Sequence, residues 1–423
     1  MIIQGQTGVP NGLTNVQLFT PGPRFGFAYD LFGDGKTAIR GGFGISVLPQ
    51  TQIDTGLQNL PPYNYTPKTY YGTLSTYLGT AGTLFPSNVR GNDWSQLVQS
   101  YSFSLGVQRD VGYSTVVDVA FVGNLGRHLL QTQNLNTIPY GERFLPSRQD
   151  STNPGKPLPD SFLTPYIGLG TVNYGEPVGN SSYYALQAQA NRRFSHGFEF
   201  KANFTWSKSM DYNRDNLPLY ADRVLMNYGE SSFDRTFITN LAWLYELPGA
   251  RALPNSVLRA ALGHWNVSGT TQFASGTPMG VTFSTVSGAD LIGGGDGHGD
   301  TQRININGSA QLGYGDRSRL QFFDTNVFSL PAPGYIGSAG RNVFRGPGQN
   351  QWDLATFKNF VIKENLTFQL RGEFYNAFNH AQWTTINNAA KFNAAGQQIN
   401  TLFGQATADR GPRVIQLAVR VSF

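Results

Sequence analysis

The sequence contains no cysteine. Disulfides, thiolate metal sites and cysteine nucleophiles are therefore excluded. Charged residues are also scarce: they make up 13% of the 423 residues, against roughly 25% in ordinary soluble domains. The net charge of +5 is spread along the chain. Because Lys and Arg form no cluster, the sequence does not predict nucleic-acid binding.

Long apolar runs and catalytic motifs are missing as well. No stretch approaches the about 18 uninterrupted apolar residues of a membrane helix. The first ten residues lack a basic region followed by an apolar run, so we expect no signal peptide there. The five histidines have no metal-binding spacing, and no nucleophile elbow or phosphate-binding loop occurs. We therefore expect no enzyme activity and no cofactor.

What the chain has in abundance is glycine and aromatic residues, with 50 Gly, 30 Phe and 20 Tyr. Residues 198–207 alternate five apolar with five polar side chains, and residues 414–423 alternate in the same way up to the aromatic Phe423. A period of two indicates extended strands. We predict about eleven strands of roughly ten residues each. They are expected at residues 24–30, 37–47, 101–108, 115–122, 184–191, 198–207, 237–245, 265–273, 351–360, 366–375 and 414–423.

The connections between these strands alternate in length. Short turns are expected near residues 33–36, 109–112 and 193–197, whereas residues 49–95, 131–180 and 276–350 read as long irregular segments. A soluble sandwich would use shorter strands and shorter loops. Long loops on one side only are typical of an outer-membrane barrel. The sequence thus predicts an all-β fold: part of an antiparallel transmembrane β-barrel, about 11–12 strands of a larger barrel, with long extracellular loops.

Five charged residues fall on the polar side of predicted strands: Glu199, Lys201, Arg371, Glu373 and Arg420. They fit a hydrated or salt-bridged lumen wall. They also fit a substrate path, or a surface against which a plug domain docks.

The most site-like segment lies in residues 290–300, where Asp290, Asp296 and Asp300 are separated mainly by glycines. Carboxylates spaced in this way could ligate calcium. The segment lacks the spacing and terminal glutamate of an EF-hand loop. A flexible surface loop is therefore the favoured interpretation, and the three aspartates are weak candidates for calcium ligands.

Several motifs resemble one family when taken in order along the chain. They are residues 23–30 followed by 33–44, residues 122–129, Ser232–Arg235, Gly340–Gly348, residues 357–360 and residues 374–380. Together they are similar to the barrel of TonB-dependent outer-membrane receptors of the Oar-like type. The resemblance covers nearly the whole chain.

This resemblance implies a barrel of about twenty-two strands, preceded by a plug domain and a carboxypeptidase-regulatory-like domain. Residues 1–423 show neither domain and only about half of the strands, so we expect the C-terminal barrel portion of a receptor, without plug or signal peptide. Asn136, Tyr183, Asp234, Arg235 and Gly340–Gly348 lie in the shared motifs, and we interpret them as loop-anchoring.

The implied location is the bacterial outer membrane, and the implied function is energised uptake of an unknown ligand captured by extracellular loops. The expected partners are outer-membrane lipid, the barrel assembly machinery, which would read the terminal strand ending in Phe423, and the TonB energy complex, which would act through the plug region. A passive pore and a surface adhesion or structural barrel remain as alternatives.

Overall fold

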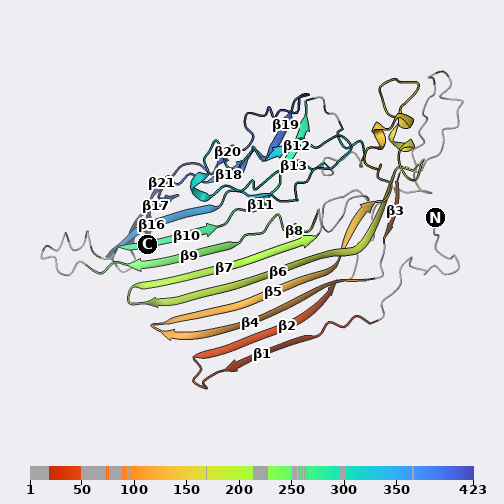
Figure 1. The fold of residues 1–423 in the computed structure, drawn as a ribbon. Coiled ribbons are helices and arrows are strands. Elements are labelled where there is room, and N and C mark those ends of the chain that lie inside the picture. The colour runs from red at the N-terminus through yellow and green to blue at the C-terminus, as the bar shows by residue number, and fades with distance from the viewer. Residues whose placement is uncertain are drawn as a thin grey trace.

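The computed structural model describes residues 19–48, 88–92, 96–167, 169–212, 227–249, 265–286, 290–294, 302–363 and 366–423, with seven isolated residues between them. Among these residues, no helix is long and apolar enough to cross a membrane. The dominant element is one large antiparallel sheet, in which each long strand pairs with the next along the chain (Figure 1).

Eleven strands follow one another across this sheet. They are β1 (Arg24–Asp30), β2 (Thr37–Leu48), β4 (Val98–Gly112), β5 (Thr115–Asn134), β6 (Thr171–Ser195), β7 (Phe198–Tyr212), β9 (Phe237–Glu246), β10 (Asn266–Ala274), β16 (Gln349–Lys363), β17 (Leu366–Tyr375) and β21 (Val414–Ser422). β3 (Asn88–Asn92) pairs with β6 in parallel, and β8 (Gly229–Glu230) pairs with β7. The described sheet is open, with edges at β1 and β21, as expected of part of a larger barrel. The all-β, antiparallel prediction is confirmed.

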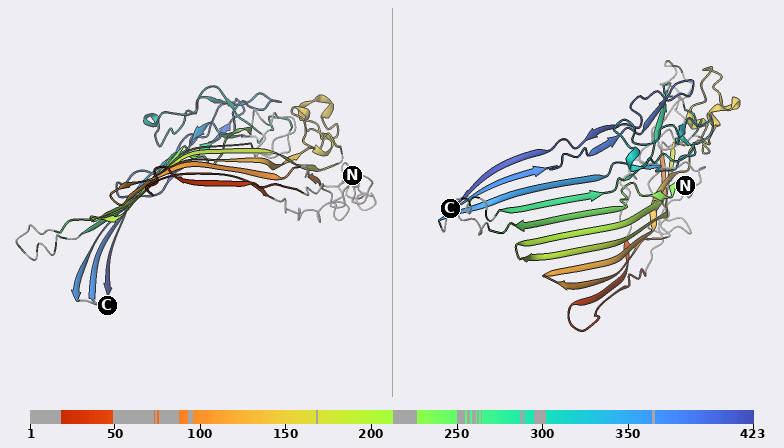
Figure 2. Two further views of the ribbon diagram at one scale, coloured as in Figure 1. Left: turned by 90° about the horizontal axis from the view of Figure 1, so that it is seen from below. Right: turned by 60° about the vertical axis from the view of Figure 1, so that its left-hand side comes forward.

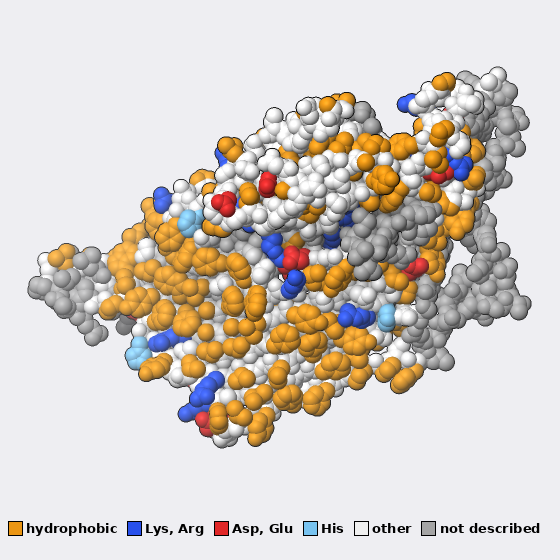
Figure 3. All heavy atoms as spheres, viewed as in Figure 1, with side chains coloured by type: hydrophobic (Ala, Val, Ile, Leu, Met, Phe, Trp, Pro, Cys, Tyr) orange, Lys and Arg blue, Asp and Glu red, His pale blue; other side chains and the backbone are white. Residues whose placement is uncertain are grey.

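The two faces of the sheet differ in chemistry. On one face, which we call the apolar face, large side chains stay exposed: Phe25 is 66% exposed on β1, Trp206 is 59% exposed on β7 and Leu417 is 78% exposed on β21. Figure 3 shows rows of hydrophobic side chains over the strands, with few charged groups between them. An apolar surface of this extent requires an apolar environment. In a barrel that environment is the lipid.

Large rings on the apolar face lie over glycines of the neighbouring strand. Phe27 covers Gly41, and Phe103 covers Gly123. On β10, a Cβ added at Gly269 would lie 2.9 Å from the ring of Trp243 and 2.8 Å from Leu354. Glycine is needed at these positions because the ring occupies the space of its missing side chain. Such aromatic–glycine pairs help to pin the register of a sheet.

Short turns lie at one end of the strands and long loops at the other. Tyr113 and Ser114 join β4 to β5 with positive φ angles of 52° and 58°, which is the geometry of a type I′ hairpin turn. The sequence had placed this turn at residues 109–112, but β4 continues to Gly112. Figure 2 shows the loops gathered at the end of the strands opposite the C-terminus. The predicted asymmetry holds for these connections except the one between β9 and β10, which was expected to be short: β9 ends at Glu246 and β10 begins only at Asn266.

The prediction for residues 131–180 was wrong in part. β5 and β6 contain 20 and 25 residues, so both strands continue into this supposedly irregular segment. Only its middle part is loop, with three 3-10 turns at Glu142–Phe144, Pro146–Arg148 and Asp160–Phe162. At about 3.3 Å per residue, β6 would extend roughly 80 Å if it were straight. It therefore projects beyond a hydrocarbon core of about 30 Å even when tilted.

The described parts of the loops between β10 and β16 and between β17 and β21 pack together into one unit, which we call the loop block (residues 275–286, 290–294, 302–348 and 376–413). Its strands pair locally, β11 with β15, β12 with β19, β13 with β14 and β18 with β20. They are β11 (Pro278–Met279), β12 (Thr282–Thr285), β13 (Asn305–Ile306), β14 (Phe328–Ser329), β15 (Phe344–Arg345), β18 (Trp383–Ile386), β19 (Ala389–Phe392) and β20 (Ala406–Asp409), with a 3-10 turn at Tyr314–Asp316.

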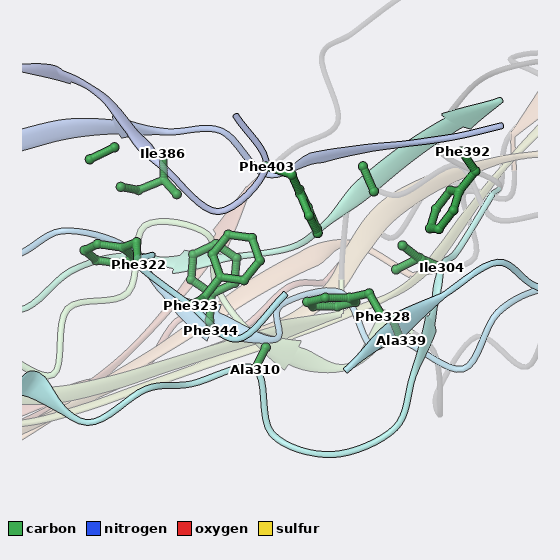
Figure 4. Close-up of a cluster of buried hydrophobic side chains, with 12 residues drawn as sticks. Ile304, Ala310, Phe322, Phe323, Phe328, Ala339, Phe344, Ile386, Phe392 and Phe403 are labelled. Carbon is green, nitrogen blue, oxygen red and sulfur yellow. The ribbon is translucent and has the colours of Figure 1, made fainter. Parts of the chain in front are cut away.

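An apolar core holds the loop block together. Phe323 is fully buried, its ring stacks on that of Phe344 at 4.3 Å between centroids, and Phe403 meets it edge-on at 5.3 Å (Figure 4). Ile304 and Phe392 are also closed off from solvent. Residues 276–350 are thus not the plain irregular stretch that the sequence indicated. The main hydrophobic core of the described chain lies in its loops, because the strands turn their apolar side chains outward.

Candidate functional site: the polar face and the loop anchors

The face opposite the lipid-facing side chains, which we call the polar face, brings together residues from six strands. Glu199 and Lys201 come from β7, and Arg371 and Glu373 come from β17. All four border a hollow of about 650 Å³, together with backbone and side chains of β6, β9, β10 and β16. The strand register explains why β7 and β17 contribute to the same hollow. From Glu199 on β7, the residues that lie opposite one another on β9, β10, β16 and β17 are Leu244, Ser268, Ala355 and Glu373.

Within this hollow, Arg371 is held by its neighbours. Its Nε donates to Glu373 Oε1 at 2.6 Å, and its guanidinium lies over the Phe357 ring at 5.6 Å. The other carboxylate oxygen of Glu373 accepts from the Tyr375 hydroxyl at 2.7 Å. The Arg371 side chain is 41% exposed, so solvent screens the pair and it contributes little to stability. These groups form a hydrated wall of mixed charge.

Arg420 lies outside the hollow. It is on the edge strand β21, opposite Gln369, on the same face as Arg371 and Glu373. The structure thus gathers four of the five predicted charged residues around one space and leaves the fifth at the sheet edge. Phe423, the predicted assembly signal, is fully exposed at the end of the same strand.

A second hollow, of about 410 Å³, adjoins the first towards the loops. Amide side chains of β7, β9, β10 and β16 line it, and Arg410 reaches it from the loop block. Arg410 donates to Gln349 Oε1 at 3.4 Å. These amides were not predicted as site residues, although the polar residues at alternate positions of each strand indicate the face on which they lie.

Three ion pairs, made by two arginines, fasten the loop block to the end of β7 and to the segment between β8 and β9. Arg341 pairs with Asp211, which is 7% exposed. Arg345 bridges Glu230 and Asp234, with 2.7 Å from its Nη2 to each carboxylate. Asp234 also accepts the backbone N–H of Ser209 at 2.6 Å. Burial acts to lower the pKa of Arg345, but its hydrogen bonds and charge contacts with Asp234 and Glu230 outweigh this and raise it. Arg341, Arg345 and Asp234 fall in the motifs interpreted as loop-anchoring, whereas their partners Asp211 and Glu230 lie outside them.

The other residues of those motifs are placed as follows. Asn136 donates from its amide to the carbonyls of Leu169 and Gly170 and accepts from the backbone N–H of Tyr166, which closes the β5–β6 loop. Arg235 donates to the carbonyl of Ser275 at 2.6 Å. Tyr183 lies within β6, opposite Ser209 of β7.

The aspartate-glycine segment joins two loops. Asp290 forms an ion pair with Arg143 at 2.6 Å, and its other carboxylate oxygen accepts the backbone N–H groups of Ile292 and Gly293. A Cβ at Gly294 would meet the carbonyl of Pro139. The glycines therefore permit a close approach of two backbones. Asp296 and Asp300 lie outside the described residues, and within the described part of the chain no group of three His, Asp or Glu gathers to hold a metal.

An open antiparallel sheet with a lipid-facing surface, a polar face and loops at one end defines part of a transmembrane β-barrel. The chain matches the outer membrane beta barrel domain over residues 1–416 and belongs to that family. The protein is therefore a component of the bacterial outer membrane.

Among solved structures, the chain is similar to the outer membrane transporter YddB from Escherichia coli, with 10% identity, a TM-score of 0.40, and coverage of 93% of this chain and 39% of that one. It is also similar to the FrpB iron transporter from Neisseria meningitidis, with 11% identity, a TM-score of 0.39, and coverage of 94% of this chain and 38% of that one. For BauA, the ferric preacinetobactin receptor from Acinetobacter baumannii, the identity is 10% and the TM-score is 0.42, with coverage of 95% of this chain and 36% of that one. The chain spans about two fifths of the length of the first of these proteins. No curated protein sequence matches it significantly.

Proposed function

We propose that the protein is the barrel part of an outer-membrane receptor that captures a ligand with its extracellular loops and passes it along the polar face. The observation that carries this proposal is the loop block. Its buried aromatic core and its ionic anchors to β7 hold a defined surface beside the polar wall.

We further propose that uptake is energised by the TonB complex through a plug domain, as the resemblance to Oar-like receptors implies. Glu199, Lys201, Arg371 and Glu373 would then line the lumen, with Arg420 on the same wall. The mixture of charges favours neither anions nor cations by sign alone. Outer-membrane lipid would cover the apolar face, and the barrel assembly machinery would bind the strand ending in Phe423.

Planar-bilayer recording of the full-length protein, purified from native outer membranes, tests this function. A plugged receptor is expected to give no stable channels. Long-lived conductance steps would overturn the proposal and support a passive pore. A matched preparation with the plug domain deleted is the control, because removing the plug should open the barrel and demonstrate that the reconstitution itself succeeds.

A further inference from the structure

A row of amide side chains crosses the polar face from strand to strand. Seven successive strands place one amide or carboxyl group at the same register. These residues, which we call the amide row, are Gln108 on β4, Asp118 on β5, Gln189 on β6, Asn203 on β7, Asn240 on β9, Gln272 on β10 and Gln351 on β16. Only Asp118 carries a charge.

The row runs diagonally between the two ends of the sheet. Gln351 is close to the loop end of β16, which begins at Gln349. Gln108 lies near the opposite end of β4, which leads to the short turn at Tyr113 and Ser114. Neighbouring strands are about 4.8 Å apart, so the seven residues span about 29 Å. The row therefore connects the loop side of the polar face with the short-turn side.

The middle of the row is open and available for hydrogen bonds. Among the described residues, no hydrogen bond engages the side-chain amide of Gln189, Asn203 or Asn240, whereas Gln272 accepts one from Gln349 at 2.6 Å. The hollow of about 410 Å³ lies over Asn203, Asn240 and Gln272. A solute in this space meets five amide side chains, with the charged groups of Lys201, Asp353 and Arg410 at the same hollow.

The chemistry of the row favours neutral hydroxyl groups. A primary amide offers two N–H donors and a carbonyl acceptor and carries no charge. A sugar hydroxyl likewise donates and accepts, and a linear glycan repeats hydroxyls along its length, as the row repeats amides from strand to strand. A peptide would in addition need different pockets for its successive side chains, whereas the row presents the same kind of group from strand to strand.

We propose that the amide row binds neutral linear oligosaccharides of about six sugars as they move along the polar face. This inference rests on the proposed receptor function and names the class of its ligand. A hexasaccharide in extended form is comparable in length to the row.

The test is isothermal titration of the full-length protein, purified from native outer membranes, with maltohexaose, cellohexaose and mannohexaose. At least one is expected to bind. The double variant Asn203→Leu/Asn240→Leu keeps side-chain size and removes two amides. Each lost hydrogen bond should lower the affinity about five-fold, so the double variant should bind the hexasaccharide about 25-fold more weakly than the wild type. Asn203→Gln/Asn240→Gln retains the amides and should bind within a few-fold of the wild type.

Gln416→Leu is the matched control, because Gln416 is an exposed amide on the same face but lies outside the row, on β21. It should bind as the wild type does. Heat-shifted mobility on gels checks that each variant is folded. If the double variant fails to assemble, Gln272→Leu replaces it, with an expected loss of about five-fold.

The inference is overturned if no hexasaccharide binds, or if the folded variants bind as tightly as the wild type. It is also overturned if hexaglycine binds with the same sensitivity to the variants, because the row would then recognise peptides. Bilayer recordings separate the two proposals. Stable channels together with sugar binding that depends on the row would refute the proposed receptor function and support the proposed role of the amide row. A closed barrel that binds no hexasaccharide would support the receptor function and refute the role of the row.

Discussion

Replacing Phe323 by alanine should loosen the loop block and leave the sheet intact. Phe323 is fully buried, stacked on Phe344 and edge-on to Phe403. A buried Phe removes about 200 Å² from water, which at about 25 cal/mol per Å² corresponds to about 5 kcal/mol as an upper estimate. Measured Phe→Ala changes cost about 3–5 kcal/mol. We expect the free energy of opening of the loop block to fall by about 4 kcal/mol, which corresponds to a roughly thousand-fold rise in the population of its open form.

Hydrogen exchange followed by mass spectrometry on the full-length protein measures this opening. Amides that hold the block together should lose protection, including the N–H of Phe322, which donates to Gly404 at 2.7 Å, and that of Asp324, which donates to Ala310 at 2.9 Å. Amides in β16 and β17 should keep theirs, because the ladder between these strands does not depend on the block.

The control is Tyr314→Ala, which removes an aromatic ring from the same block at a position that is 91% exposed. Its exchange should match the wild type. Unchanged protection in Phe323→Ala, or an equal loss in the strands, would refute the view that the loops have their own cooperative core.

Three further outcomes are expected. Asp234→Ala leaves Arg345 with one of its two carboxylates and should cost about 3–5 kcal/mol, visible as a lower temperature of the heat-induced gel shift; an unaltered transition would contradict the anchoring role. Gly269→Val places a side chain against the Trp243 ring and should lower the free energy of unfolding, measured in urea, by about 1–3 kcal/mol. Gly229→Ala, which has open space around it, should have a much smaller effect. In Gly293→Ala the added methyl group would clash with the Phe144 ring, and alanine disfavours the positive φ of 64° at this position. The contact between the two loops should weaken, so proteases added to intact cells should cut the β5–β6 loop faster. Equal rates of cleavage would argue against this contact.

The sequence was misleading where one pattern fits two structures. Gln131 to Asn134 and residues 171–180 are strand, yet they lack clear apolar alternation because this part of β5 and β6 extends beyond the apolar layer. Period-two hydrophobicity signals a strand only where its two faces meet different environments. At Asp290 the structure adds a contact that the sequence did not indicate, since this carboxylate pairs with Arg143 of another loop and Gly294 lies close to the backbone of Pro139.

By itself, the sequence determined the fold class, the positions of the main strands and the polar side of each, because side-chain alternation along a strand is local. It therefore predicted Glu199, Lys201, Arg371 and Glu373 on the polar sides of their strands, and the register shows that these sides form one face of the sheet. Only the tertiary structure decided which residues stand side by side across strands. The amide row depends on the register between seven strands, and turn geometry and cross-strand packing set that register. The loop core was equally hidden, since Phe323 and Phe403 are eighty residues apart and meet only when two polar, glycine-rich segments fold against each other.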